Sequence, residues 1–207
     1  MEKIVNIITL GEMSVGKTSI INRIKEDRFD EFIQPTTNFD VITIKKPYKN
    51  MTMILKFHDT IGQEKFMNIL PIQYIRDSHI ILLVFDSIET LNVLRHRWFG
   101  FYKEHTNTEN PIFILIGNKS DTFGNERDEI VRQGDEFSQE INAHFITCSA
   151  KSKDNIDNLE RYIITESRRY IDEEEKNNKK KEINQEKNEK KHLDKKKMKK
   201  EKKGCCS

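Results

Sequence analysis

Apolar residues in the first two thirds of the chain occur in short blocks, separated by longer segments with helical spacing. Two nearly continuous apolar runs, Ile80 to Phe85 and Ile112 to Ile116, are typical of strands buried on both faces of a parallel sheet. Ile4 to Leu10 and His144 to Cys148 predict further short strands. Two more strand-like runs, residues 41–46 and 51–58, flank a turn-like stretch and therefore predict an antiparallel hairpin.

Helical spacing fills the gaps between these strands. We expect helices over residues 17–25, 66–76, 89–104 and 126–140, and from Ile156 onward, where Ile156, Leu159 and Ile163 share a face. Alternating strands and helices predict a doubly wound α/β domain. The expected architecture is a six-stranded, mostly parallel sheet with one antiparallel hairpin strand and helices on both faces.

The domain is expected to cover residues 1–171, and a different kind of segment follows over residues 172–207. From Asp172 the chain is almost all Lys, Glu and Asn, and its apolar residues are Ile183, Leu193 and Met198. Such a segment cannot bury enough apolar surface to offset its ordering entropy. We expect a mostly disordered, flexible tail, and the alternative is a solvated extension of the last helix.

Charge is distributed unevenly between these two parts. The chain has 36 Lys and Arg against 34 Asp and Glu, but residues 172–203 hold 14 Lys and nine acidic residues. The body is therefore mildly acidic, which argues against a nucleic-acid-binding face.

The longest apolar run is far shorter than a membrane span, and the opening residues lead directly into a strand, so we expect no secretory leader. Three cysteines, two of them adjacent at the end, predict a reduced, cytosolic chain in which Cys148 is a core residue.

A phosphate-binding motif follows the first strand and opens the first helix. The pattern G-x-x-x-x-G-K-[ST] is formed here by Gly11, Glu12, Met13, Ser14, Val15, Gly16, Lys17 and Thr18, with Ser19 next. Glycines let backbone N–H groups close around phosphates, and the helix N-terminus adds favourable partial charge. Lys17 is expected to reach the β- and γ-phosphates, and the Thr18 hydroxyl to bind Mg²⁺.

That motif alone leaves an ATPase, a GTPase and a small-molecule kinase open, and a second motif narrows the choice. Asp59 ends the strand-like run 51–58, where a carboxylate that holds Mg²⁺ would lie. Gly62 could place a backbone N–H on the γ-phosphate. Gln63 is then placed to orient an attacking water and is the candidate catalytic residue.

A third motif indicates the base. Asn118, Lys119 and Asp121 follow an apolar strand, and a carboxylate there can accept hydrogen bonds from N1–H and the 2-amino group of guanine. Adenine has neither donor, which makes the discrimination strong. Lys119 can lay its stem along the base plane. Ser149, Ala150 and Lys151 follow the next strand, where the Ala150 N–H could meet guanine O6.

Together these motifs resemble the Ras superfamily of small GTPases, from Lys3 to about Tyr170. Within it the chain looks like a Rab. Residues 57–66 are similar to the Rab switch II sequence, residues 74–78 resemble the segment after it in Golgi-associated Rabs, and Glu12 to Ser14 lean the same way. The end, Gly204-Cys205-Cys206-Ser207, looks like a Rab double-cysteine prenylation signal.

The resemblance implies a P-loop GTPase domain that switches between GTP and GDP forms with Mg²⁺ as cofactor. By position, Phe29 would pack on the guanine, and Thr36 would be the switch I threonine that binds Mg²⁺ beside Thr18 and Asp59. Loss of the γ-phosphate would release both switch loops. Effectors would read those loops, an exchange factor would reset them, and a GTPase-activating protein would speed hydrolysis. We expect a monomer with a role in vesicle trafficking.

Several residues depart from the Rab pattern. Residues 37–41 differ from the typical switch I sequence, His58 replaces the usual tryptophan, and a recurrent aromatic aligns with Gln73 or, if one residue is inserted, with Tyr74. Known effector specificities therefore do not carry over. Met13 and Ile61 replace smaller residues near the γ-phosphate, so we expect slow hydrolysis. The alternative is a GTP-locked or pseudo-GTPase scaffold.

The tail predicts membrane attachment. Cys205 is third from the end, which does not match C-a-a-X but fits double geranylgeranylation of Cys205 and Cys206. Residues 195–203 hold seven lysines and one Glu, which suit an anionic membrane surface. We expect the chain to lie at the cytosolic face of a Golgi or endosomal membrane, with a cytosolic pool after extraction. Its expected partners include the prenylation and membrane-extraction machinery.

Two further alternatives are a P-loop ATPase and a nucleic-acid-associated protein. Residues 118–121 argue against the ATPase, and the acidic body argues against the nucleic-acid-associated protein.

Overall fold

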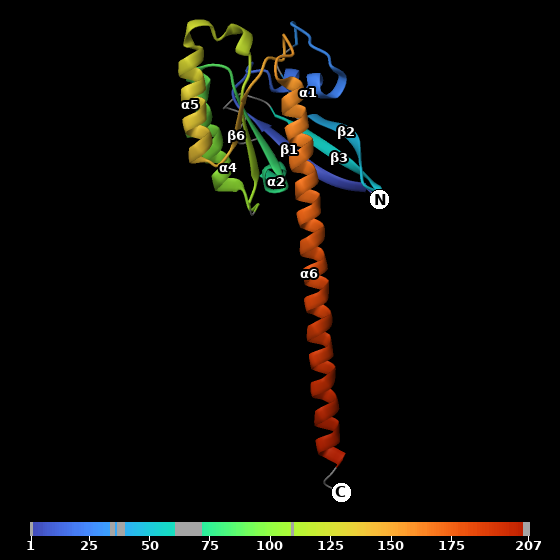
Figure 1. Cartoon of the computed structure of the whole chain (residues 1–207). Coiled ribbons are helices and arrows are strands. Elements are labelled where there is room, and N and C mark those ends of the chain that lie inside the picture. Colours follow the sequence, from blue (N-terminus) through green and yellow to red (C-terminus); the bar gives the residue numbers. More distant parts are fainter. Residues whose placement is uncertain (1, 34–35, 37–39, 61–71, 109, 205–207) are drawn as a thin grey trace. The chain divides into compact units, whose positions relative to one another are not determined.

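The structure is a computed structural model, and it describes residues 2–33, 36, 40–60, 72–108 and 110–204, with the backbone alone over residues 181–204. Contacts divide the chain into two compact units, residues 1–167 and 168–207. Six strands of the first unit form one sheet in the order β2-β3-β1-β4-β5-β6 (Figure 1). They are β1 (Glu2–Leu10), β2 (Asp40–Tyr48), β3 (Met51–Asp59), β4 (Ile80–Phe85), β5 (Ile112–Gly117) and β6 (His144–Thr147).

The sheet is parallel except at one edge. Strand β1 pairs in parallel with β3 and β4, and β5 and β6 extend the parallel ladder. Strand β2 pairs antiparallel with β3 around a tight turn that brings Tyr48 opposite Met51. The predicted α/β fold with one antiparallel hairpin strand is confirmed.

Helices cover the sheet because its central strands have two apolar faces. They are α1 (Lys17–Glu26), α2 (Ile72–Arg76), α3 (Ile88–Val93), the π-helical turn η2 (Leu94–Trp98), α4 (Phe99–His105), the short 3₁₀ turns η3 (Ser120–Thr122) and η4 (Gly124–Glu126), α5 (Arg127–Glu140) and α6 (Ile156–Gly204). Every residue of β4 is buried, as its apolar run predicts. Along β1, Ile8 and Leu10 join the core cluster around Trp98, whereas Val5 and Ile7 are buried on the alternate face.

Two helices differ from their predicted bounds. The expected helix 66–76 is described only from Ile72, and residues 66–71 lie outside the described part of the chain. The helix expected over 89–104 is α3, η2 and α4 in succession, and the π-helical turn within it was not predicted.

The second unit is described, from Arg168 to Gly204, as a continuation of α6. The prediction of a mostly disordered tail from Asp172 therefore differs from the structure, which follows the alternative of an extended last helix. Lys and Glu are strong helix formers, and oppositely charged side chains four residues apart support a solvated helix. Within the described residues, no helix combines the length and the apolar character needed to span a bilayer.

Candidate nucleotide-binding site

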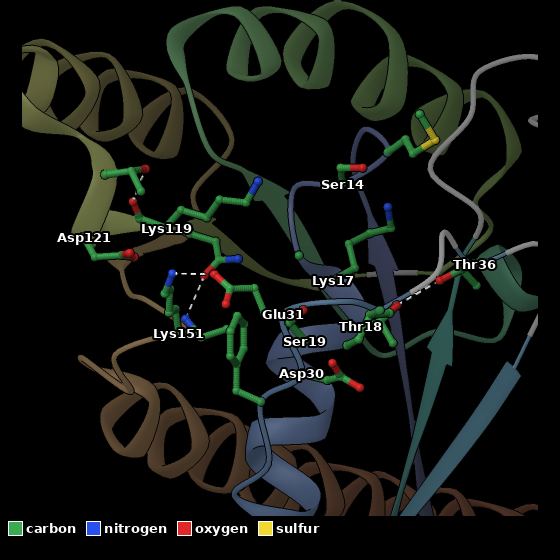
Figure 2. Close-up of a pocket in the computed structure, with 17 residues that line it drawn as sticks. Ser14, Lys17, Thr18, Ser19, Asp30, Glu31, Thr36, Lys119, Asp121 and Lys151 are labelled. Carbon is green, nitrogen blue, oxygen red and sulfur yellow. Dashed lines mark hydrogen bonds and ion pairs between the residues drawn. The ribbon is translucent and has the colours of Figure 1, made fainter.

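A cavity of about 450 Å³ opens at the carboxyl-terminal edge of the sheet, where the loops after β1, β5 and β6 meet. Ligands of open α/β sheets bind at this edge. Figure 2 shows the lining side chains converging on the cavity from these loops and from α1. The residues that line it are Met13, Ser14, Gly16, Lys17, Thr18, Ser19, Phe29, Asp30, Glu31, Ile33, Thr36, Asn118, Lys119, Asp121, Thr122, Ala150 and Lys151.

The loop between β1 and α1 requires its two glycines. Gly11 has φ +147°, and a Cβ there would lie 2.1 Å from the Val84 carbonyl oxygen. Gly16 has φ +94°, and its Cβ would lie 2.2 Å from Nδ2 of Asn118. Since Gly16 has no side chain with which to cap α1, the first N–H groups of that helix remain available to an anion.

Lys17 supplies a buried positive charge to this loop. Its side chain donates to the carbonyl oxygens of Gly11 and Glu12, at 2.9 Å each. Burial lowers the pKa of Lys17 to about 8, and the carboxylates of Asp59 and Glu12 oppose that shift. The ammonium is thus still mostly protonated at neutral pH, as phosphate binding requires.

The three residues predicted to hold Mg²⁺ lie together. The Thr18 hydroxyl is 2.6 Å from Oδ2 of Asp59 and 2.9 Å from the Thr36 hydroxyl, the second contact being drawn in Figure 2. Burial raises the pKa of Asp59, with the Thr18 hydroxyl and Lys17 opposing the shift. The other carboxylate oxygen, Oδ1, is buried without a hydrogen-bond partner among the described residues. An unpaired buried carboxylate oxygen beside two hydroxyls fits a small, hard cation such as Mg²⁺.

Asn118 joins the phosphate loop to the base-binding loops. Its Nδ2 donates to the Val15 carbonyl at 2.8 Å, and its Oδ1 accepts from the Ala150 N–H at 3.1 Å. The side chain is buried. One amide therefore joins two loops that are far apart in the sequence, since Val15 and Ala150 are separated by 135 positions. The Ala150 N–H, expected to meet guanine O6, donates to Asn118 in this structure.

Asp121 and Lys119 border the same end of the cavity. The Ser149 hydroxyl donates to Oδ1 of Asp121 at 2.5 Å, so Ser149 orients this carboxylate without itself lining the cavity. The Lys119 ammonium lies 2.7 Å from the Asp86 carboxylate. This pairing leaves the stem of Lys119 as part of the cavity lining.

Most predicted site residues thus meet in one place. The lining does not include Gly11, Glu12, Val15, Asp59 and Ser149. Gly62 and Gln63, like Ile61, lie outside the described residues, and so do the two predicted lipidation sites, Cys205 and Cys206.

A comparison with protein families identifies the chain. The model of the Ras family matches residues 6–169. The chain belongs to the Ras family. Members of this family are small GTPases, which bind GTP and GDP with Mg²⁺, hydrolyse GTP and work with exchange factors, activating proteins and effectors.

Sequence reasoning did not indicate the lining residues Asp30, Glu31, Ile33 and Thr122, nor Arg23 of α1. Two of these residues hold the loop after β6 of this Ras-family site. Arg23 of α1 donates to the carbonyl oxygens of Ala150 at 2.7 Å and Lys151 at 3.0 Å, bracing the loop after β6. Glu31 forms an ion pair of 2.7 Å with Lys151 at the cavity mouth. Each contact joins residues more than 100 positions apart, so no local sequence pattern could have indicated them.

An aromatic contact joins the end of β3 to α2. The ring of His58 stacks on Tyr74, with 4.4 Å between ring centroids, whereas Gln73 is exposed. Of the two candidate positions, Tyr74 is therefore the one that contacts β3 in this Ras-family chain.

Proposed function

We propose that the chain is a Rab-type small GTPase that recruits effectors in its GTP form and thereby regulates intracellular vesicle trafficking. The observation that carries the switch is the contact of Thr36 with Thr18, and of Thr18 with Asp59. Through these two contacts, Thr36 is joined to Thr18 at the start of α1, and Thr18 to Asp59 at the end of β3. The Rab assignment is supported by the sequence of residues 57–66 and by the paired cysteines at the end.

The residues of the site divide the work of binding. The backbone of residues 11–17 and the ammonium of Lys17 would hold the β- and γ-phosphates, and Asp121 would accept the guanine donors. Thr18, Thr36 and Asp59 would hold Mg²⁺, which when bound neutralises charge on the phosphate oxygens. Because Thr36 would contribute only while a γ-phosphate completes the site, its loop would be released after hydrolysis.

We further propose that hydrolysis is slow, with Gln63 orienting the attacking water. Met13 lines the cavity with 45% of its surface exposed, so a flexible thioether occupies space beside the phosphate loop. Crowding there would misplace an incoming catalytic group by a fraction of an ångström or more, and about 1 Å can cost about 100-fold in rate.

Single-turnover phosphate release tests this proposal. The full chain is loaded with GTP and Mg²⁺, with ATP as competitor, and compared with Met13→Gly. Release that ATP does not inhibit, and that Met13→Gly accelerates, supports a slow guanine switch. Tight GTP binding without release in both chains would favour a GTP-locked scaffold. Failure to hold GTP would overturn the assignment of residues 118–121.

The proposed location is the cytosolic face of a Golgi or endosomal membrane, with a cytosolic pool after extraction. Two geranylgeranyl groups on Cys205 and Cys206 would anchor the chain more firmly than one lipid can. The lysines of residues 195–203 would add attraction to anionic lipid headgroups.

A further inference from the structure

The helix from Ile88 to His105 contains one π-helical turn, between Leu94 and Trp98. There the backbone N–H of Phe99 donates to the carbonyl of Leu94, five residues earlier. Such a turn inserts one residue and rotates the side chains beyond it by roughly 100°. π-helical turns inside α-helices are frequent at functional sites, and this one ends at the single tryptophan of the chain.

Trp98 reaches from the core to the phosphate loop. Its indole is fully buried in a cluster that includes Leu94, Tyr102 and Phe137. From that position Nε1–H donates to the carboxylate of Glu12 across 2.7 Å. The bond is short, as expected when the acceptor is charged, and its donor belongs to a ring that core packing holds in place.

Glu12 passes this constraint to the phosphate-binding lysine. Its side chain accepts from Trp98, and its backbone carbonyl accepts from the Lys17 ammonium at 2.9 Å. Glu12 is therefore held by Trp98 through its side chain, and it holds Lys17 through its backbone.

We propose that Trp98 is a positioning residue for nucleotide binding, acting through Glu12 on the phosphate loop and Lys17. The proposal rests on the loop's binding of nucleotide phosphates. If Trp98 served only to fill the core, a phenylalanine would replace it at a cost in stability alone. The indole N–H, paired with a loop carboxylate, predicts an effect on nucleotide retention as well.

Dissociation of radiolabelled GDP from the full chain in Mg²⁺ tests the proposal. Trp98→Phe and Glu12→Ala should each speed dissociation about tenfold, because each removes one charge-assisted hydrogen bond. The double variant should dissociate no faster than either single variant, because both remove the same contact. Glu12→Gln keeps an acceptor oxygen and should restore dissociation to within about threefold of the native rate.

Tyr102→Phe provides a matched control in the same core cluster. It removes a buried hydroxyl that accepts from Thr106, away from the phosphate loop, and should change stability without changing GDP dissociation. The fluorescence of the single tryptophan gives an independent signal, and its emission should shift in Glu12→Ala but not in Tyr102→Phe.

The proposal is overturned if Trp98→Phe releases GDP within about twofold of the native rate, or if the effects of Trp98→Phe and Glu12→Ala multiply. A native chain that fails to bind GDP would contradict nucleotide binding itself. A native chain that binds GDP, with variants that retain it equally well, would contradict only the role of Trp98.

Discussion

At the scale of single residues, Asn118 joins two loops through one side chain. Its amide accepts from the loop after β6 and donates to the phosphate loop. Asp121, which we propose accepts the guanine donors, is exposed at the cavity and oriented by Ser149. Substitutions at these two positions should therefore have different consequences, structural at Asn118 and selective at Asp121.

Replacing Asp121 should abolish the choice of base. The native carboxylate can accept two hydrogen bonds from guanine but only one from hypoxanthine, which lacks the 2-amino group. We expect Asp121→Asn to weaken GDP binding roughly 100-fold and to remove the preference for GDP over inosine diphosphate. Competition binding with both nucleotides measures this, and a retained preference for GDP would show that another group reads the base.

Cys148 should make stability fall at high pH. Burial raises the pKa of its thiol from 9.0 to about 12. Between these values the unfolded chain loses a proton that the folded chain keeps, so the free energy of unfolding decreases as pH rises. The decrease is at most about 1.4 kcal/mol per pH unit. Denaturant unfolding at about pH 8 and about pH 10 measures this. The free energy of unfolding should fall more between the two pH values for the native chain than for Cys148→Ala, and equal decreases would contradict a raised pKa of the Cys148 thiol.

At the scale of elements, two helical glycines differ in their surroundings. Gly134 of α5 faces Phe145 of β6, and a Cβ there would lie 2.5 Å from the ring. At Gly100 of α4, a Cβ would have no heavy atom within 4 Å among the described residues, apart from its chain neighbours and the backbone of its own helix. The two positions therefore separate helix propensity from packing.

Alanine substitution at these positions should have opposite effects. Gly100→Ala should raise the free energy of unfolding by about 0.5–1 kcal/mol, because alanine loses less backbone entropy on folding. Gly134→Ala gains the same propensity but must displace the Phe145 ring, at a cost of about 1–3 kcal/mol, so we expect net destabilisation. Chemical denaturation of both variants decides the matter, and stabilisation of both would show that the ring moves freely.

The elements also show what the sequence can and cannot predict. Ile80 to Phe85 was predicted to the residue because a continuous apolar run has one favourable environment, the middle of the sheet. The phosphate and base motifs were recognisable because their residues are close in the chain. The contact of Trp98 with Glu12 spans 86 positions, and that of Arg23 with Lys151 spans 128, so only the folded sheet brings them together.

At the scale of the whole molecule, charge separates the mildly acidic body from the basic end of the chain. Seven lysines and one Glu occupy residues 195–203, and each lysine near an anionic surface contributes about 1 kcal/mol. An anionic surface should therefore attract the basic tail and weakly repel the acidic body.

The chain without lipid groups should bind vesicles that contain phosphatidylserine, because the basic tail is attracted to them. Binding should weaken steeply as salt is raised, since ions screen the attraction. Sedimentation with vesicles measures it, with phosphatidylcholine vesicles and a chain ending at Asp194 as controls. Equal binding by the shortened chain would place the contact elsewhere.

The strand order has a consequence for folding during translation. Strand β1 emerges first and ends up in the middle of the sheet, and β2 and β3 follow as a local hairpin whose second strand pairs with β1. Strands β4, β5 and β6 then add one after another to the free side. Every strand after the hairpin finds its partner already synthesised, so the sheet can grow outward during translation without waiting for a distant segment.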